Sequence, residues 1–277
     1  MGIPTVSPVS DYLNAVKDES TAAATYATTD ATTKNEVAAF TKNAASITSA
    51  DGLLKNYSAL QVVLGAYGLS SISGETALIK DLLTQDPTSS KSLAKSSGNA
   101  TWLAFADAFS TWGANGGSSA TSPFTSDLIS SITSQFEQSQ YENNTANSNS
   151  GIGNALYFTR KMGNVTSIAG LMSDPTLMKV VETTLGYDPD QFGALDYDQQ
   201  VRILTKKVDL SKISTPDQIQ KYAEQYLAML QINPQTPSKD ATMMDLFGGS
   251  PDSNSILQLF GSSSSSPPFS SQYSGLF

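Results

Sequence analysis

The segment from Asp188 to Gln199 comes closest to the spacing of a metal-binding loop. Its first, third and ninth positions carry Asp188, Asp190 and Asp196, as a calcium-binding loop requires. However, Phe192 replaces a ligand at the fifth position, and Gln199 replaces the bidentate glutamate at the last. We therefore expect no metal site here, and we interpret the segment as a helix-capping turn in which Asp196 or Asp198 begins the next helix.

Carboxylate pairs are the second candidate for chemistry, because two acids across a cleft can hydrolyse a glycosidic bond. The first half of the chain offers Asp51, Glu75, Asp81 and Asp107. Such chemistry needs the two carboxyl groups about 5 to 9.5 Å apart. No spacing in the sequence indicates that arrangement, and acids near helix starts are already explained by capping. We predict no catalytic residue.

Two residue types that carry most enzyme chemistry are missing, since the chain has no His and no Cys. This excludes disulfides, thiolate nucleophiles and the usual base beside a nucleophilic serine. Gly151 and Gly153 lack the third glycine of a dinucleotide-binding loop, and Lys206 with Lys207 is typical of a solvated helix end. The sequence therefore favours a protein that is not an enzyme and that binds no cofactor.

Composition also limits the partners. The net charge is −9, which disfavours binding to phosphate backbones and to anionic lipid surfaces. Only 15% of residues are charged, so Ser, Thr, Asn and Gln must wet much of the surface. Residues 1–8 have neither the basic start nor the apolar run of a cleaved signal peptide, and no later run is long enough to span a bilayer. We expect no nucleic acid and no membrane insertion. The protein either stays in the cytoplasm or leaves the cell by another route.

The elements that would position any site follow an internal repetition. Phe40–Lys42 and Phe158–Arg160 match 118 positions apart, and Gly68 matches Gly186 at the same distance. Further matches resume after small shifts, which favours two related halves. The alternative is a chance similarity between two stretches of amphipathic helix.

Helical periodicity runs through both halves. Thr33 and Glu36 form a capping-box pattern, after which Val37, Phe40 and Ala44 step along one face by three and four residues. The predicted fold is all-α: a multi-helix bundle built from two related helical halves, with disordered N-terminal and C-terminal segments. The predicted segments are a weakly ordered start (1–32), the first half (33–112), a connector with one helix (113–151), the second half (152–233) and a Ser/Pro/Gly-rich tail (234–277).

The tail repeats a small Leu-Phe element three times. Apolar islands in a polar tail are typical of docking motifs, although such dipeptides also arise by chance or pack back on the domain. The candidate partner-binding residues are Leu246, Phe247, Leu259, Phe260, Leu276 and Phe277.

Two stretches resemble a known family. They are Ile47–Leu69, with its Tyr57 and the Leu64–Leu69 run, and Phe192–Tyr226. Both are similar to a bacterial family catalogued as domain of unknown function 1217, found mainly in alphaproteobacteria and often near flagellar genes. The resemblance covers roughly residues 36–112 and 152–230, and no catalytic residues come with it.

The resemblance implies a link to the flagellum. Our leading expectation is a non-enzymatic structural or accessory protein that contacts flagellar components, exported without a cleaved signal peptide and with oligomerisation possible. The alternative is a cytoplasmic adaptor or chaperone for flagellar export substrates. A carboxylate-based hydrolase is a third class, which would need two acids converging in one pocket.

Overall fold

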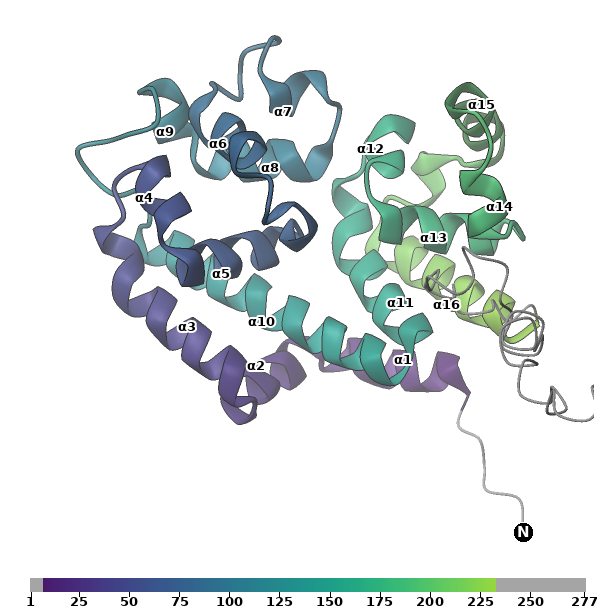
Figure 1. Ribbon diagram of the computed structural model, residues 1–277. Helices are drawn as coiled ribbons and strands as arrows, with labels where there is room; N and C mark the ends of the chain where they lie inside the picture. The colour runs from purple at the N-terminus through teal and green to yellow at the C-terminus, as the bar shows by residue number, and fades with distance from the viewer. Residues whose placement is uncertain (1–6, 233–277) are drawn as a thin grey trace, which may run out of the picture. The chain divides into compact units, whose positions relative to one another are not determined.

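The computed structural model describes residues 7–232, which belong to one compact unit that extends to Pro234. These residues form α-helices joined by short turns and by four single turns of 3-10 helix, so the all-α prediction is confirmed (Figure 1). In chain order the elements are α1 (Pro8–Lys17), α2 (Glu19–Thr29), α3 (Ala31–Asn43), η1 (Ala44–Ser46), α4 (Ala50–Lys55), α5 (Tyr57–Tyr67), η2 (Ser70–Ile72), α6 (Thr76–Thr84), α7 (Leu93–Ser96), α8 (Ala100–Ala108), α9 (Ser110–Ala114), α10 (Ser126–Ser148), α11 (Ser150–Lys161), η3 (Met162–Asn164), α12 (Ile168–Met172), α13 (Pro175–Thr184), α14 (Pro189–Gly193), α15 (Tyr197–Lys207), η4 (Leu210–Lys212) and α16 (Pro216–Ile232).

The first apolar core is rich in aromatic rings. It gathers buried side chains from α3 to the first part of α10, around α5 as the central helix. Phe109 stacks on Trp112 with ring centroids 5.2 Å apart, and Phe124 meets both rings edge-on. Offset and edge-to-face contacts of this kind add to the stabilisation that burial alone gives.

The second apolar core is built from α11 to α16, with Tyr12 of α1 inserted into it. The long helix α10 joins the two cores. Its Ile132 and Phe136 lie in the first core, and Tyr141, which follows later on the same helix, packs against the second. The residues predicted as a connector therefore supply a helix that both cores need for their burial.

The two halves share a local design at the spacing of 118 residues. Ser49 and Ser167 cap α4 and α12 through the same bond, in which the side chain accepts from the N–H three residues later. Gly68 and Gly186 end α5 and α13 with φ of 77° and 81°, a left-handed conformation that glycine adopts without steric cost. This agreement favours the two related halves, and the duplication itself stays our interpretation.

The start of the first half differs from the capping-box prediction. Helix α3 begins at Ala31, because Asp30 rather than Thr33 is its cap. The Asp30 carboxylate accepts both the backbone N–H and the hydroxyl of Thr33, at 2.8 and 2.7 Å. Thr33 itself is buried inside the first turn. An aspartate three residues upstream therefore outcompetes the threonine for the same role.

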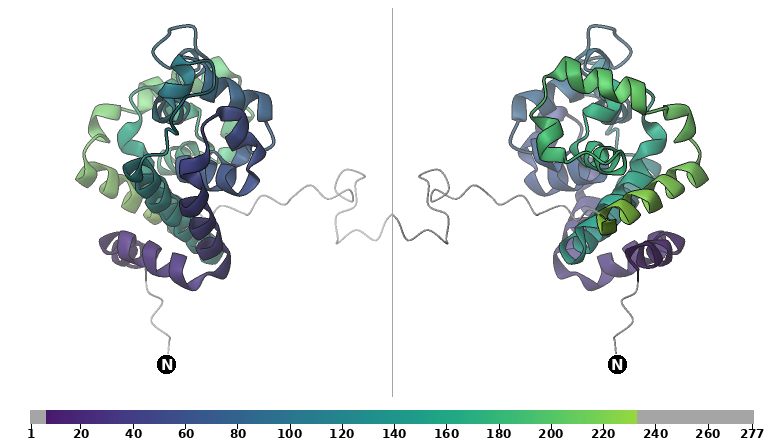
Figure 2. Two further views of the ribbon diagram at one scale, coloured as in Figure 1. Left: turned by 90° about the vertical axis from the view of Figure 1, so that its left-hand side faces the viewer. Right: turned by 90° about the vertical axis from the view of Figure 1, so that its right-hand side faces the viewer.

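Residues 8–29 also differ from the expected weakly ordered start. They form α1 and α2, which we call the N-terminal strap, and Figure 2 shows both purple helices together beneath teal α10 and α11. Helix α1 packs on α11 and α16, whereas α2 packs on α10 and α3. Tertiary contacts compensate for the weak apolar periodicity of this segment. Tyr12 is buried, and its hydroxyl lies 2.7 Å from Thr159 Oγ1. The predicted tail 234–277 lies outside the described residues.

The tight crossing of α10 and α11 gives a test of the fold. A Cβ atom added to Gly153 would lie 2.6 Å from Cα and 2.7 Å from N of Ala146, and backbone atoms cannot move aside alone. We expect Gly153→Ala to lower the free energy of unfolding by about 1–3 kcal/mol, because overpacking outweighs the helix propensity of alanine. Urea denaturation measures this. Gly193→Ala is the matched control, since nothing lies within 4 Å of the added atom, and equal stability of both variants would contradict the packing.

Candidate functional site

A cleft lies where the two halves face each other. Its volume is about 490 Å³. The first half contributes the turn after α5, η2 and the start of α8, and the second half contributes α11 and the turn before α13. Helix α10 supplies Ser139, Glu142 and Asn143. This cleft is the candidate site, and the fold lines it with segments that are far apart in sequence.

A buried ion pair lies beneath the cleft. Glu142 of α10 binds Arg160 of α11 through two parallel bonds, each 2.6 Å, between Nε and Oε1 and between Nη2 and Oε2. The side chains are only 3% and 11% exposed. Burial alone would lower the pKa of Arg160, but the hydrogen bonds and charge of Glu142 outweigh it and raise that pKa. Arg160 therefore stays charged, and its two bonds to Glu142 fix how α10 crosses α11.

A second pair covers the first. The Tyr157 hydroxyl donates to Asp174 Oδ2 at 2.7 Å, and the Arg160 guanidinium lies 5.4 Å from the centre of the Tyr157 ring. Asp174 Oδ1 caps α13 by accepting from the N–H groups of Thr176 and Leu177. Burial and the neighbouring Asp174 raise the pKa of Tyr157 well above its ordinary value. Tyr157 is thus a hydrogen-bond donor at neutral pH and a poor proton-transfer group.

A lysine joins the halves at the side of the cleft. Lys161 Nζ donates to the carbonyl oxygen of Tyr67 at 3.0 Å, at the end of α5 where that carbonyl has no partner further along the helix. Burial, followed by the charge of Arg160, lowers the pKa of Lys161 to about 8. The ammonium group of Lys161 is held in a hydrogen bond between the two halves, so Lys161 acts as a structural cation.

The groups that remain for a ligand are neutral. Ser139 and Asn99 line the cleft although each residue is only 8% exposed. Within residues 7–232, the Ser139 hydroxyl and the Asn99 Nδ2 group have no hydrogen-bond partner, while Asn99 Oδ1 caps α8. Asn143 is exposed at the cleft. The charged side chains of the floor are paired or capping, so the cleft offers hydrogen bonds to uncharged polar groups rather than acid–base chemistry.

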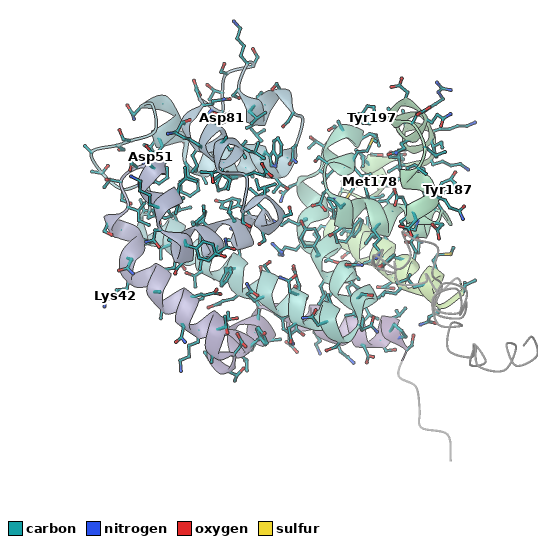
Figure 3. The ribbon with its side chains drawn as sticks, viewed as in Figure 1. Lys42, Asp51, Asp81, Met178, Tyr187 and Tyr197 are labelled. Carbon is teal, nitrogen blue, oxygen red and sulfur yellow. The ribbon has the colours of Figure 1, made fainter. Side chains whose placement is uncertain are left out.

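The acids considered for hydrolysis do not line this cleft. Asp51 pairs with Lys80 at 2.9 Å on the surface, and Asp81 and Asp107 are exposed. Figure 3 labels Asp51 on α4 and Asp81 on α6. Neither of them belongs to the cleft lining, which contains Tyr157 and Asp174. Glu75 immediately precedes α6 without making a side-chain cap.

The calcium-like segment contains two helix starts, but the side-chain cap is made by Asp188 and not by Asp196 or Asp198 as the capping interpretation expected. The Asp188 carboxylate accepts from the N–H of Gln191 at 3.0 Å and begins α14, while Asp196 precedes α15 without a side-chain cap. Phe192 is buried against Tyr187 rather than open to an ion. In the part of the chain that the structure describes, no group of three or more acidic side chains could hold a metal ion.

The predicted partner-binding residues Leu246, Phe247, Leu259, Phe260, Leu276 and Phe277 lie outside the described residues. None of the described helices is both long and apolar enough to cross a membrane.

The sequence prediction missed the polar floor of the cleft. One signal was available, because Ile132, Phe136, Ser139 and Glu142 follow one helix face in steps of three and four, so a charge falls on a buried stripe. A buried charge needs a partner of opposite sign. Nothing in the spacing indicated that the partner would be Arg160.

The ion pair gives a second test. Arg160→Met leaves Glu142 buried without its counter-charge, so we expect a loss of about 3–5 kcal/mol in the free energy of unfolding. Lys80→Met, which breaks the exposed pair with Asp51, should cost no more than about 1 kcal/mol. Chemical denaturation of both variants measures the difference. Similar losses would show that the Glu142–Arg160 pair is not desolvated.

Comparison with known proteins places the chain in a family. The family model described as protein of unknown function DUF1217 matches residues 66–219. An X-ray crystal structure of a protein from Agrobacterium tumefaciens is similar in fold, with a TM-score of 0.70 and 20% identity over 84% of this chain and 99% of that one. No curated protein matches the chain. Because the matched residues 66–219 are more than half of the sequence, the chain belongs to the DUF1217 family.

Proposed function

We propose that this protein is a non-enzymatic structural or accessory component associated with the bacterial flagellum, and that it acts by binding other proteins. The cleft between the halves is the contact site. The chemistry of the cleft is the observation that supports this proposal most. The charged groups of the cleft floor are hydrogen-bonded to each other or to Tyr157, whereas Ser139, Asn99 and Asn143 offer uncharged donors and acceptors. An extended polypeptide presents uncharged N–H and C=O groups in alternation, which such side chains bind well.

The flagellar setting comes from the family resemblance, in which members often lie near flagellar genes. The composition, with no Cys and few charges, is compatible with export. Export requires the chain to unfold, and a chain with no Cys has no disulfide to reduce first. Under this proposal the protein is exported from the cell and contacts flagellar components there. No nucleic acid or membrane insertion enters the proposal.

The alternative is a cytoplasmic adaptor or chaperone for flagellar export substrates. The same cleft favours it equally, because export substrates travel unfolded and present extended backbone. The two proposals differ in location and not in the chemistry of the site. Fractionation therefore separates them.

The location of the protein in the cell separates the two proposals. We expect the protein to copurify with flagella or to be found outside the cell, and to be retained inside a strain that lacks flagellar export. Deletion should reduce motility. Retention inside wild-type cells in a stable complex with an export substrate would favour the adaptor. Normal motility after deletion, together with cytosolic location in both strains, would contradict both proposals.

The second prediction concerns the cleft. Asn143→Trp fills it with a bulky side chain, so binding of the partner should weaken by about tenfold or more, equivalent to about 1.4 kcal/mol. The matched control is Asn144→Trp, because Asn144 is also exposed on α10 but does not line the cleft.

Both variants are introduced into the deletion strain, and motility is measured alongside the amount of folded protein. Asn144→Trp should restore motility as the wild type does, and Asn143→Trp should not. If both restore it equally, the cleft is not the contact site, and a role in the flagellum would then have to use another surface.

A further inference from the structure

The N-terminal strap is held by little apolar surface. Helix α2 has 11 residues and buries two of them, Ala23 and Ala27, whereas α5, of the same length, buries eight. The hydroxyls of Thr25 and Thr29 donate to carbonyl oxygens of their own helix. In the described residues they form no hydrogen bond to another helix. Tyr12 is the one buried residue of α1. Other interactions must therefore contribute to holding the strap across both cores.

Glu19, the first residue of α2, lies against the buried ion pair. Its Oε1 atom is buried and has no hydrogen-bond partner among residues 7–232. Glu142 and Arg160 both interact with it electrostatically. Glu142 already occupies Nε and Nη2 of Arg160, and no hydrogen bond or ion pair joins Glu19 to that guanidinium in the described part of the chain. An ionised Glu19 would be buried beside a like charge, which is costly.

Among the described residues, no other element around Glu19 supplies a cation within ion-pair distance, and this includes Lys17 at the end of α1. Tyr12 of α1 is neutral, and Glu224 of α16 adds negative charge near that tyrosine. Helix α3, which also packs on α2, carries Lys34, Glu36 and Lys42. None of these forms an ion pair with Glu19 in the described part of the chain. Protonation of Glu19 is the remaining way to remove the repulsion, and a protonated carboxyl can donate to Glu142.

We propose that the N-terminal strap is gated by a proton: protonated Glu19 holds α1 and α2 across both cores, and ionised Glu19 releases them. Release would uncover the apolar surface on α11 and α16 that Tyr12 covers, so the proton controls access to that surface. This inference does not depend on the flagellar proposal.

The direction of the pH dependence follows from linkage. Burial, then the charge of Glu142, raises the pKa of Glu19 from 4.5 to about 7 in the attached strap. In a released strap the carboxyl faces water and its pKa returns to the ordinary value. Attachment is therefore strongest below the ordinary pKa, weakens as the pH rises towards 7, and changes no further once Glu19 is ionised in both states.

The absence of Cys in the chain allows a direct measurement. Ala23→Cys places a thiol under α2 at a position 1% exposed, and its rate of modification by a thiol reagent reports strap release. Ala66→Cys, at a position 0% exposed in the first core, reports opening of the whole unit. Rates are divided by those of the same thiols in denatured protein, which removes the titration of the thiol itself.

Between about pH 5 and about pH 8 we expect the corrected rate at residue 23 to rise by about tenfold or more, and the rate at residue 66 to rise less. Adding Glu19→Gln, a neutral side chain of the same shape, should flatten the profile at residue 23. The matched control is Glu182→Gln. Burial, followed by Asp188, raises the pKa of Glu182 to about 7 as well, but that residue lies on α13 away from the strap, so its replacement should leave the profile at residue 23 steep.

Hydrogen exchange of α1 and α2 amides in the wild-type protein gives a second measurement that needs no variant. Faster exchange in the strap than in α5 at about pH 8, after correction for the intrinsic rate, is the expected result. The proposal is wrong if Glu19→Gln keeps the steep profile, or if residues 23 and 66 become accessible together.

Discussion

The buried pair between Glu142 and Arg160 is the interaction on which the arrangement of the unit depends. It lies where α10 crosses α11, and α10 packs on both apolar cores. Above it the Tyr157–Asp174 pair forms the cleft floor, and beside it Glu19 begins α2. A buried pair of charges tolerates few geometries, because each charge loses its solvation unless the partner stays in place. The pair therefore makes the relation between the two cores specific, although the apolar cores supply most of the stabilisation.

The halves themselves are built by local rules. Side-chain caps at Ser49, Asn56, Ser167 and Asp174 start the helices, and glycines with positive φ at Gly68 and Gly186 end them. At two of these places a local device also serves the junction: Asp174 caps α13 and accepts from Tyr157, and the carbonyl before Gly68 accepts from Lys161. The carbonyl that ends α5 in the first half thus contacts Lys161 of the second half, and the cleft lies beside this contact.

The chemistry available in that cleft is limited because its charged residues already have structural roles. Every charged group in the floor already has a structural partner, and what remains is a set of uncharged side chains in a sheltered groove. This is the basis for proposing a protein-contact role for a member of the DUF1217 family. Glu19, whose buried Oε1 atom has no hydrogen-bond partner among residues 7–232, is assigned to control of the N-terminal strap.

The sequence by itself determined the helical class, and it favours two related halves. These depend on caps, glycines and apolar periodicity, which act over a few residues and are visible in one dimension. Composition excluded imidazole and thiol chemistry for the same reason. Only the tertiary structure decided that residues 8–29 are helical, since Tyr12 and two alanines need the surfaces of α10, α11 and α16 to be buried. It also decided that Glu19, Glu142 and Arg160 meet, because charges distant in sequence interact through space once three helices have been packed together.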